Sequence, residues 1–185
     1  MNDSKDEIKN LFIEQKKLVD YYFEHLDYQQ FLNFVNLILE IKSNEGVIYL
    51  TGMGKSGIIS HNISQMLVSI GVRAMFLSPV DALHGDVGVL TNKDLLVFFS
   101  RSGQTSELIN LLPSVRTKQT KTVAVISNQN GQLARECDIM IHLPLEKELC
   151  PFDLAPTTSS IVQLIFGNTI VTMLMKQTGL TKEEY

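Results

Sequence analysis

Two segments of the sequence combine the residue types that bind a small anion. The first, S-R-S-G-Q-T at residues 100–105, brings three hydroxyl groups and a glycine directly behind an apolar run. The second, T-G-M-G-K-S-G at residues 51–57, adds three glycines, a lysine and a serine behind another apolar run. Glycine lets a backbone approach a ligand closely, and a helix that starts in such a loop directs free N–H groups at an anion. Two loops of this kind favour a small phosphorylated ligand that lies across both.

Helix capping is the plainest alternative for the hydroxyl-rich segment. Ser102 or Thr105 would then cap a helix, and Glu107 would interact favourably with the helix dipole in the first turn. Capping explains one of the three hydroxyl groups, so ligand binding is the favoured interpretation. The glycine-rich segment could likewise be a tight turn that binds nothing, but Lys55 at such a turn suits a charged ligand.

Neither nucleotide motif that the glycine-rich segment suggests is complete. A Walker A loop needs a glycine six residues before its lysine, and Tyr49 occupies that position. A dinucleotide fold needs an acidic residue at the end of the next strand, whereas Asp81 follows late, beyond a proline. A lone G-x-G-x-x-G is a weak signal. We therefore expect no nucleotide cofactor.

Short apolar runs that alternate with amphipathic stretches form the framework around these segments. Each run has the length of a strand that is buried on both faces. The runs cover residues 47–50, 74–77, 95–99, 122–126 and 139–143. Helical spacing of apolar residues marks 4–43, 58–70, 106–118, 132–136 and 157–177, with one helix starting near Lys55.

This alternation predicts an α/β fold, in which a five-stranded parallel sheet carries helices on both faces. We expect one domain at residues 46–185, with an N-terminal helical extension at residues 1–45 packed on it. Ligands of such sheets bind beyond the carboxyl ends of the strands. Both anion-binding segments follow a predicted strand directly, so they belong to that edge.

Composition excludes several functional classes. The chain has 185 residues, 44% hydrophobic and 19% charged, as expected of one globular domain, and its net charge of −4 argues against a nucleic-acid partner. No apolar run reaches the length that spans a bilayer, and the polar start M-N-D-S-K-D-E-I-K-N is unlike a signal peptide. We therefore expect a cytoplasmic protein without a membrane partner. Cys137 and Cys150 are expected to be reduced, and their spacing does not suggest a metal site.

Four motifs give the sequence a specific family resemblance. S-R-S-G-Q-T-S-E resembles the phosphate-binding signature of the sugar isomerase (SIS) domain. T-G-M-G-K-S-G, A-L-H-G-D-V-G and K-E-L-C-P-F-D-L-A-P-T-T-S resemble a narrower group, the D-arabinose 5-phosphate isomerases. The resemblance runs from about Val47 to the end of the chain. H-G-D and C-P…L-A-P-T-T-S distinguish this group from the hexulose-phosphate and heptose-phosphate isomerases of the same fold.

The resemblance implies an aldose–ketose isomerase. Such an enzyme interconverts D-ribulose 5-phosphate and D-arabinose 5-phosphate through an enediol or enediolate, without metal or cofactor. Its product supplies synthesis of Kdo, the eight-carbon acid sugar of lipopolysaccharide. Family members form tetramers with sites near subunit boundaries, so the resemblance also implies a homo-oligomer.

A candidate site follows residue by residue. The expected phosphate ligands are Ser56, Ser100, Ser102 and Thr105, in loops shaped by Gly54 and Gly103. The positions that match the family's catalytic residues are Lys55, His84, Glu107 and Glu148. Lys55 would hold the substrate or stabilise the enediolate. Glu148 would be the base at carbon, and His84, oriented by Asp86, would assist proton transfer or ring opening, although the sequence leaves the division between Glu148 and His84 open.

The sequence departs from the family pattern near its end. Family members commonly carry a pair of CBS domains, and an H-P segment just beyond the final helix whose histidine belongs to the active site. This chain ends at L-T-K-E-E-Y, before both. The chain is either natively short or a piece of a longer protein, and in the second case we expect weak or absent turnover with ligand binding partly retained. Two other functions stay open: a non-catalytic sugar-phosphate sensor, and an isomerase of another sugar phosphate.

Overall fold

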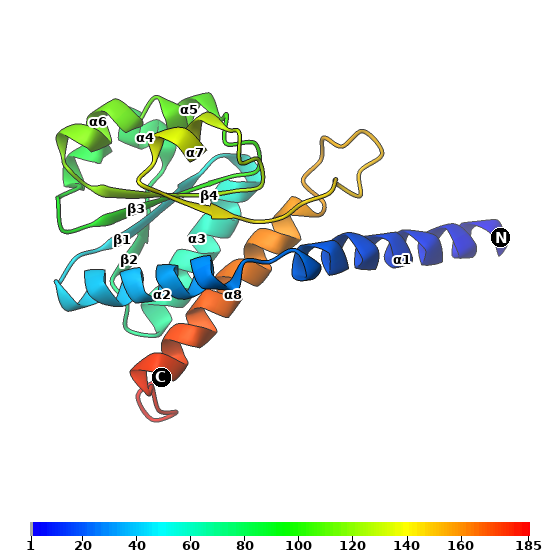
Figure 1. The fold of residues 1–185 in the computed structure, drawn as a ribbon, viewed down its shortest axis with the longest axis horizontal. Coiled ribbons are helices and arrows are strands. Elements are labelled where there is room, and N and C mark those ends of the chain that lie inside the picture. Colours follow the sequence, from blue (N-terminus) through cyan, green and yellow to red (C-terminus); the bar gives the residue numbers. More distant parts are fainter. Residues whose placement is uncertain (1) are drawn as a thin grey trace.

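Five parallel strands form one sheet in a computed structural model that describes residues 2–185 (Figure 1). The strands are β1 (Ile48–Gly52), β2 (Ala74–Phe76), β3 (Leu95–Ser100), β4 (Lys121–Ile126) and β5 (Ile139–His142). Their order across the sheet is β2-β1-β3-β4-β5. Each strand ends within two residues of its predicted limits, and the predicted α/β fold with a parallel sheet is confirmed.

Helices cover both faces of this sheet. They are α1 (Asn2–Glu24), α2 (Tyr28–Ser43), α3 (Gly54–Ser69), α4 (Pro79–Leu83), α5 (Ser106–Ile109), α6 (Leu112–Thr117), α7 (Gln132–Glu136), α8 (Ser159–Thr178) and the short 3₁₀ helix η1 (Asp86–Val89). In Figure 1, α4, α5, α6 and α7 lie on one side of the sheet, and α2, α3 and α8 lie on the other.

The two sides of the sheet bury two separate hydrophobic clusters. Successive side chains of a strand point to opposite faces, so Val97 of β3 belongs to the cluster under α2, α3 and α8, and Phe98 belongs to the cluster under α5 and α6. All six residues of β3 are buried. This two-sided burial explains why the strands read as continuous apolar runs rather than as an alternating pattern.

The prediction of one continuous helix at residues 106–118 is wrong, because the structure divides this segment into α5 and α6. Pro113 stands in the first turn of α6. Proline lacks the N–H that a continuous helix would need there, and its ring clashes with the preceding turn. The sequence analysis also missed α4 and η1, which are too short for a helical period to be visible.

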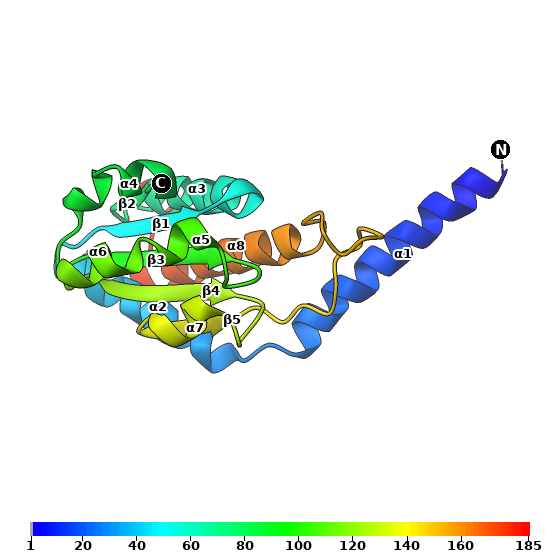
Figure 2. The same ribbon diagram turned by 90° about the horizontal axis from the view of Figure 1, so that it is seen from above.

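The N-terminal extension is only partly packed on the domain. Five side chains of α2 are buried, among them Val35 and Ile38, whereas α1 leaves the body and projects away from it (Figure 2). Leu18 and Tyr22, near the end of α1, are buried, but Leu11 and Phe12 are exposed. The expectation that residues 1–45 pack on the domain therefore holds for α2 and for the last turns of α1. It is wrong for the first half of α1.

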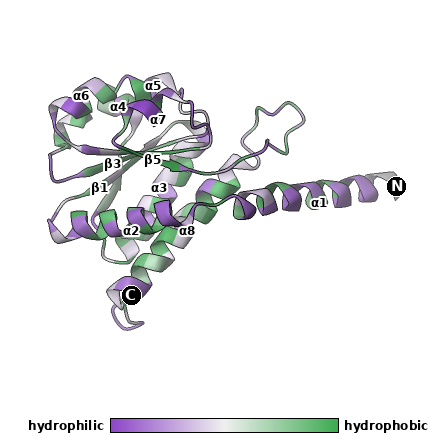
Figure 3. Cartoon of the chain, viewed as in Figure 1, coloured by the Kyte–Doolittle hydropathy of each residue, from purple (hydrophilic) through white to green (hydrophobic). Residues whose placement is uncertain are grey.

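The last helix corrects the expectation that no apolar segment reaches membrane-spanning length. Helix α8 is long and apolar enough by length and composition, and it is largely hydrophobic in Figure 3. It packs against α2 and α3, and Val162, Phe166 and Leu174 are buried there. Packing in the core accounts for part of its hydrophobicity, since 44% of its 18-residue apolar stretch is buried.

Gly167 allows α8 to approach α3 closely. A Cβ atom at this position would lie 2.4 Å from Cγ1 and Cδ1 of Ile63. Gly167→Val should therefore lower the free energy of unfolding by about 1–3 kcal/mol through overpacking, as measured by urea denaturation. Gly88→Ala is the control, because a Cβ there would meet nothing within 4 Å. An unchanged urea midpoint in Gly167→Val would contradict the close approach.

Candidate functional site

The two anion-binding loops leave the sheet side by side. Strands β1 and β3 are neighbours, and Gly52 is paired with Phe99 at their carboxyl ends. From this pair the chain continues to β2 on one side and to β4 on the other, so the strand order reverses here. A crevice opens at such a switch point and commonly binds the ligand.

The glycine-rich loop brings the N-terminus of α3 to this point. Gly54 adopts a φ of +56°, which favours glycine, and a Cβ at Gly57 would lie 2.5 Å from the Gly52 carbonyl oxygen. Met53 occupies the N-cap position, and no side-chain cap bond forms there within the described chain. At the N-cap of this 16-residue helix, therefore, no side chain of the described residues caps the first N–H groups. Lys55 is exposed and Ser56 half-buried in the same turn.

The hydroxyl-rich loop is shaped by its own side chains. Ser100 is buried, and its Oγ accepts the Gly103 N–H at 3.0 Å and lies 2.9 Å from Thr105 Oγ1 in a hydrogen bond. Ser102 Oγ accepts the Gln104 N–H at 3.1 Å and is exposed. Gly103 has a φ of +63°. Ser102 and Thr105 are therefore the more accessible hydroxyls, and Ser100 supports the turn.

The segment S-N-Q-N-G-Q after β4, which reads as a simple turn, supports the hydroxyl-rich loop. The Ser127 and Asn128 N–H groups both donate to the Arg101 carbonyl at 3.1 Å. A Cβ at Gly131 would lie 2.7 Å from the Ser102 carbonyl oxygen, so the two loops are in close contact. Sequence reasoning missed this role, because only the pairing of β3 with β4 brings the loops together.

His142 holds the segment after β4 in place, although no function was expected for it from the sequence. Its Nε2 lies 3.1 Å from the Ser127 carbonyl, and its Nδ1 lies 2.8 Å from Gln129 Nε2. Its backbone exchanges hydrogen bonds with the Gln30 side chain of α2. Burial lowers the pKa of His142. The neutral ring can donate through one nitrogen and accept through the other, which suits both contacts.

His84 and Glu107 lie on neighbouring elements. His84 follows α4 directly, Glu107 lies in α5, and these two helices contact each other. His84 is exposed, whereas Glu107 is half-buried and accepts a hydrogen bond from Ser106 Oγ at 3.0 Å. Within residues 2–185 no hydrogen bond joins the His84 ring to Asp86. The expected orientation of His84 by Asp86 is therefore not seen.

Glu148 occupies a different environment from the other candidate residues. It lies in residues 144–158, here called the strap, which connects β5 to α8 and carries the C-P-F-D-L-A-P-T-T part of the family motif. Its side chain is completely buried. Oε2 accepts the N–H groups of Thr158 and Ser159 at 2.5 and 2.9 Å, so the carboxylate binds the N-terminus of α8.

The strap is tied to the hydroxyl-rich loop through Arg101. Arg101 donates to the Asp153 backbone carbonyl at 2.8 Å and to its carboxylate at 2.6 Å. The Glu148 N–H also donates to Asp153 Oδ1, at 2.8 Å, and this bond, with the Arg101 charge, holds the pKa of Asp153 below its usual value. The sequence analysis named neither Arg101 nor Asp153 as a site residue.

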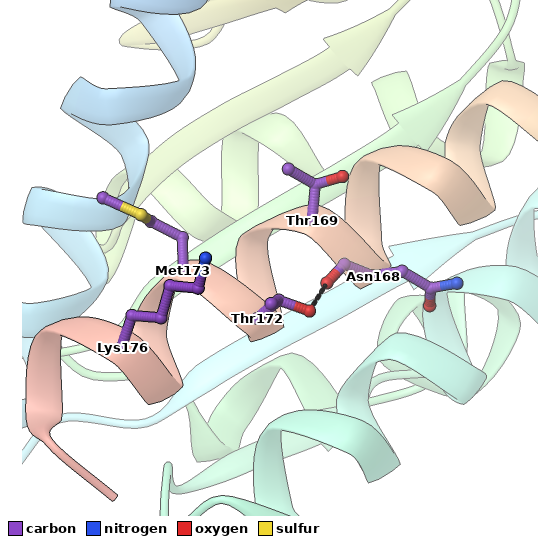
Figure 4. A pocket seen from close by; sticks show the side chains of 5 residues that line it. All are labelled: Asn168, Thr169, Thr172, Met173 and Lys176. Carbon is purple, nitrogen blue, oxygen red and sulfur yellow. Dashed lines mark hydrogen bonds between the residues drawn. The ribbon is translucent and has the colours of Figure 1, made fainter.

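Two hollows on the surface differ in their relation to these loops. One of about 320 Å³ borders the glycine-rich loop and is lined by Gly54, His61, Phe76 and Ser78 among others. Another, of about 280 Å³, lies along later turns of α8 and is lined by Asn168, Thr169, Thr172, Met173 and Lys176 (Figure 4). The first lies between the glycine-rich loop and the segment that follows β2. Within residues 2–185 no group of three or more His, Cys, Asp or Glu side chains is arranged to hold a metal ion.

Comparison with known proteins identifies relatives of this chain by sequence. The SIS domain family model matches residues 41–173. Arabinose 5-phosphate isomerase KpsF of Escherichia coli O6:H1 (strain CFT073) is 35% identical over 170 residues, 92% of this chain and 51% of KpsF. Arabinose 5-phosphate isomerase KdsD of Francisella tularensis (strain SCHU S4) is 34% identical over 157 residues, 85% of this chain and 48% of KdsD. The chain thus spans about half the length of the curated relatives it matches.

A solved structure resembles the fold over nearly its full length. The structure of E. coli CFT073 c3406 in complex with arabinose 5-phosphate matches with a TM-score of 0.91 and 26% sequence identity. The match covers 99% of this chain and 95% of that chain.

The two cysteines provide a test of the strap's environment. Burial raises the pKa of Cys137 to about 12, whereas backbone N–H groups of Ala155, Leu154 and Phe152 lower the pKa of Cys150. Thiolate is the reactive form, so iodoacetamide at neutral pH should label Cys150 at least roughly 100-fold faster than Cys137. Peptide mapping by mass spectrometry measures both rates, and Cys150→Ser should abolish the fast phase. Equal labelling of the two thiols would contradict this arrangement.

Proposed function

The chain belongs to the SIS domain family, and we propose that it is an isomerase of D-ribulose 5-phosphate and D-arabinose 5-phosphate. The observation that supports the proposal most is the pairing of β1 with β3, which sets a glycine-rich and a hydroxyl-rich loop side by side. The likeness to a structure in complex with arabinose 5-phosphate, the aldose of this pair, agrees with it.

The hydroxyl-rich loop would hold the phosphate. Ser102 and Thr105 hydroxyls and the backbone N–H groups around Gly103 supply donors, while Ser100 keeps the turn in shape. Ser56 and the start of α3 would contact the same anion from the other loop, where the helix dipole adds to the attraction. Gly54 and Gly103 allow the backbone to approach it closely.

Lys55, His84, Glu107 and Glu148 would act at the sugar. A base removes a proton from C1 of the ketose, the enediolate forms, and a proton is returned to C2 to give the aldose. Lys55, in the first turn of α3, would stabilise the enediolate oxygen electrostatically. His84 and Glu107, on the contacting helices α4 and α5, would transfer protons at the oxygens.

Glu148 is the proposed base at carbon. Its Oε2 accepts hydrogen bonds from the N-terminus of α8, but its buried Oε1 accepts no hydrogen bond within the described chain. Oε1 is therefore the oxygen with a free lone pair. Because the side chain is fully buried, the strap must move before this oxygen reaches a substrate.

The wider setting follows from the same proposal. We propose that the arabinose 5-phosphate formed enters Kdo synthesis for lipopolysaccharide, and that the reaction takes place in the cytoplasm. The family members named KpsF and KdsD support the substrate assignment, and support for the pathway is indirect, through that substrate.

We also propose that copies of the chain associate through α1, in a tetramer. Apolar residues at helical spacing form one stripe along α1. The stripe is buried at Leu18 and Tyr22 but continues past the body as Ile8, Leu11 and Phe12, which are about 50–75% exposed. Apolar side chains exposed in this way are typical of an interface.

A turnover assay tests the isomerase. The chain should convert D-ribulose 5-phosphate to D-arabinose 5-phosphate, at a rate that EDTA leaves unchanged. Ser102→Ala should raise KM roughly tenfold, because a hydrogen bond to a charged group is lost. Glu148→Gln should lower kcat roughly 10²–10⁴-fold and leave substrate affinity nearly unchanged, because it removes a base.

Binding and turnover together separate the alternatives. Calorimetric binding of D-arabinose 5-phosphate without any turnover would favour the sugar-phosphate sensor. Turnover of a different sugar phosphate would favour another isomerase. If neither pentose phosphate binds, the proposed site is wrong.

The oligomer is tested by light scattering coupled to size exclusion. Phe12→Asp puts a charge into the exposed stripe of α1 and should shift the protein to smaller species. Lys9→Asp, on the same helix but outside the apolar stripe, serves as the control and should leave the mass unchanged. A wild-type protein that is monomeric at tens of micromolar would refute the proposed interface.

A further inference from the structure

Arg101 belongs to two parts of the candidate site at once. Its backbone lies in the hydroxyl-rich loop, where its carbonyl accepts the N–H groups of Ser127 and Asn128. Its side chain leaves that loop and reaches the strap between β5 and α8. The residue therefore connects the proposed phosphate-binding loop to the segment that carries Glu148.

The guanidinium group makes a forked contact with the strap. Nη1 donates to the Asp153 carbonyl at 2.8 Å, and Nη2 donates to Asp153 Oδ1 at 2.6 Å. Nε then lies 3.4 Å from Glu148 Oε1. The guanidinium plane is rigid, so fixing its two terminal nitrogens also fixes the position of Nε.

Asp153 completes a closed ring of contacts. Its Oδ1 accepts the Glu148 N–H at 2.8 Å as well as the Arg101 side chain. It has a φ of +52°, an uncommon conformation that Asp and Asn tolerate better than most residues. Asp153 thus holds the backbone of Glu148, while Arg101 holds both Asp153 and the side of the Glu148 carboxylate.

The charge of Arg101 matters most to the free oxygen of Glu148. Oε2 of Glu148 accepts two N–H groups, whereas Oε1 is buried and accepts no hydrogen bond from the described residues. A buried carboxylate oxygen without a partner is strongly disfavoured unless a cation compensates it. Arg101 Nε supplies that positive charge at ion-pair distance without forming a hydrogen bond that would occupy the lone pair.

We propose that Arg101 is a positioning residue for the isomerase reaction, which links the phosphate-binding loop to the strap and fixes the Glu148 carboxylate within the strap with Oε1 free of hydrogen bonds from the described residues. This inference rests on the proposed function. Its consequence is that the loop proposed to bind the phosphate also fixes the position of Glu148 in the strap, through the Arg101 side chain.

Arg101→Gln, Arg101→Lys and Asp153→Asn test the link. Arg101→Gln removes the charge and the fork, Arg101→Lys keeps the charge alone, and Asp153→Asn keeps the acceptor for the Glu148 N–H but loses its negative charge. Asp153 is exposed and its conformation suits Asn, so Asp153→Asn should fold even where Arg101→Gln does not. Arg116→Gln is the matched control, because Arg116 forms a similar pair with Glu136 far from the strap.

Hydrogen–deuterium exchange of residues 144–162 without substrate gives the first readout. Exchange should be roughly tenfold faster in Arg101→Gln, less affected in Arg101→Lys and Asp153→Asn, and unchanged in Arg116→Gln. The second readout is kinetic. Arg101→Gln should lower kcat roughly 10–100-fold, since a small displacement of a catalytic group is costly, while KM stays within about threefold. Arg101→Lys should restore part of kcat.

The two readouts distinguish failure of this inference from failure of the proposed function. A wild-type chain without turnover would refute the isomerase, whereas the exchange of the strap would still show whether Arg101 holds Glu148. Unchanged exchange in a folded Arg101→Gln, or in Asp153→Asn if Arg101→Gln does not fold, would overturn the proposed link. A rise in KM with kcat unchanged would also overturn it, and would place Arg101 on the phosphate instead.

Discussion

The parallel pairing of β1 with β3 brings the candidate site together. Strands that run side by side in the same direction end at the same edge, so the loops that follow Gly52 and Ser100 meet. The chain turns to opposite sides of the sheet from these two strands, and neither connection covers the gap between them. A phosphate can therefore be approached from two loops whose glycines and hydroxyls are separated by almost fifty residues of sequence.

The buried carboxylate of Glu148 is the second organising feature. Burying a charge is unfavourable unless hydrogen bonds and an opposite charge compensate it. Two N–H groups of α8 and the Arg101 guanidinium do so here. The carboxylate thereby fixes where α8 begins, and the long apolar helix then packs against α2 and α3. A candidate catalytic residue is thus also part of what connects the strap to the core.

Much of the fold could be predicted from the sequence, and the errors have identifiable causes. The strands were found because burial on both faces makes them continuous apolar runs. The break at Pro113 and the short helices α4 and η1 were missed because helical periodicity needs several turns to be visible. Among the candidate site residues, those in the two loops were recognised from their types. The supporting residues were missed, since Arg101, Asp153 and His142 resemble ordinary surface residues until their distant partners are known.

The succession of strands and long helices along the chain and the residue types in each loop could be read from the sequence alone. They follow from dihedral preferences, periodic burial and side-chain type, which are local properties. Three features became visible only in the folded molecule: which loops are neighbours, the burial of Glu148 with one oxygen unbonded, and the uncovered first half of α1. These features arise from contacts between residues far apart in the chain. They depend on how whole elements pack, and the residues around any one position do not encode them.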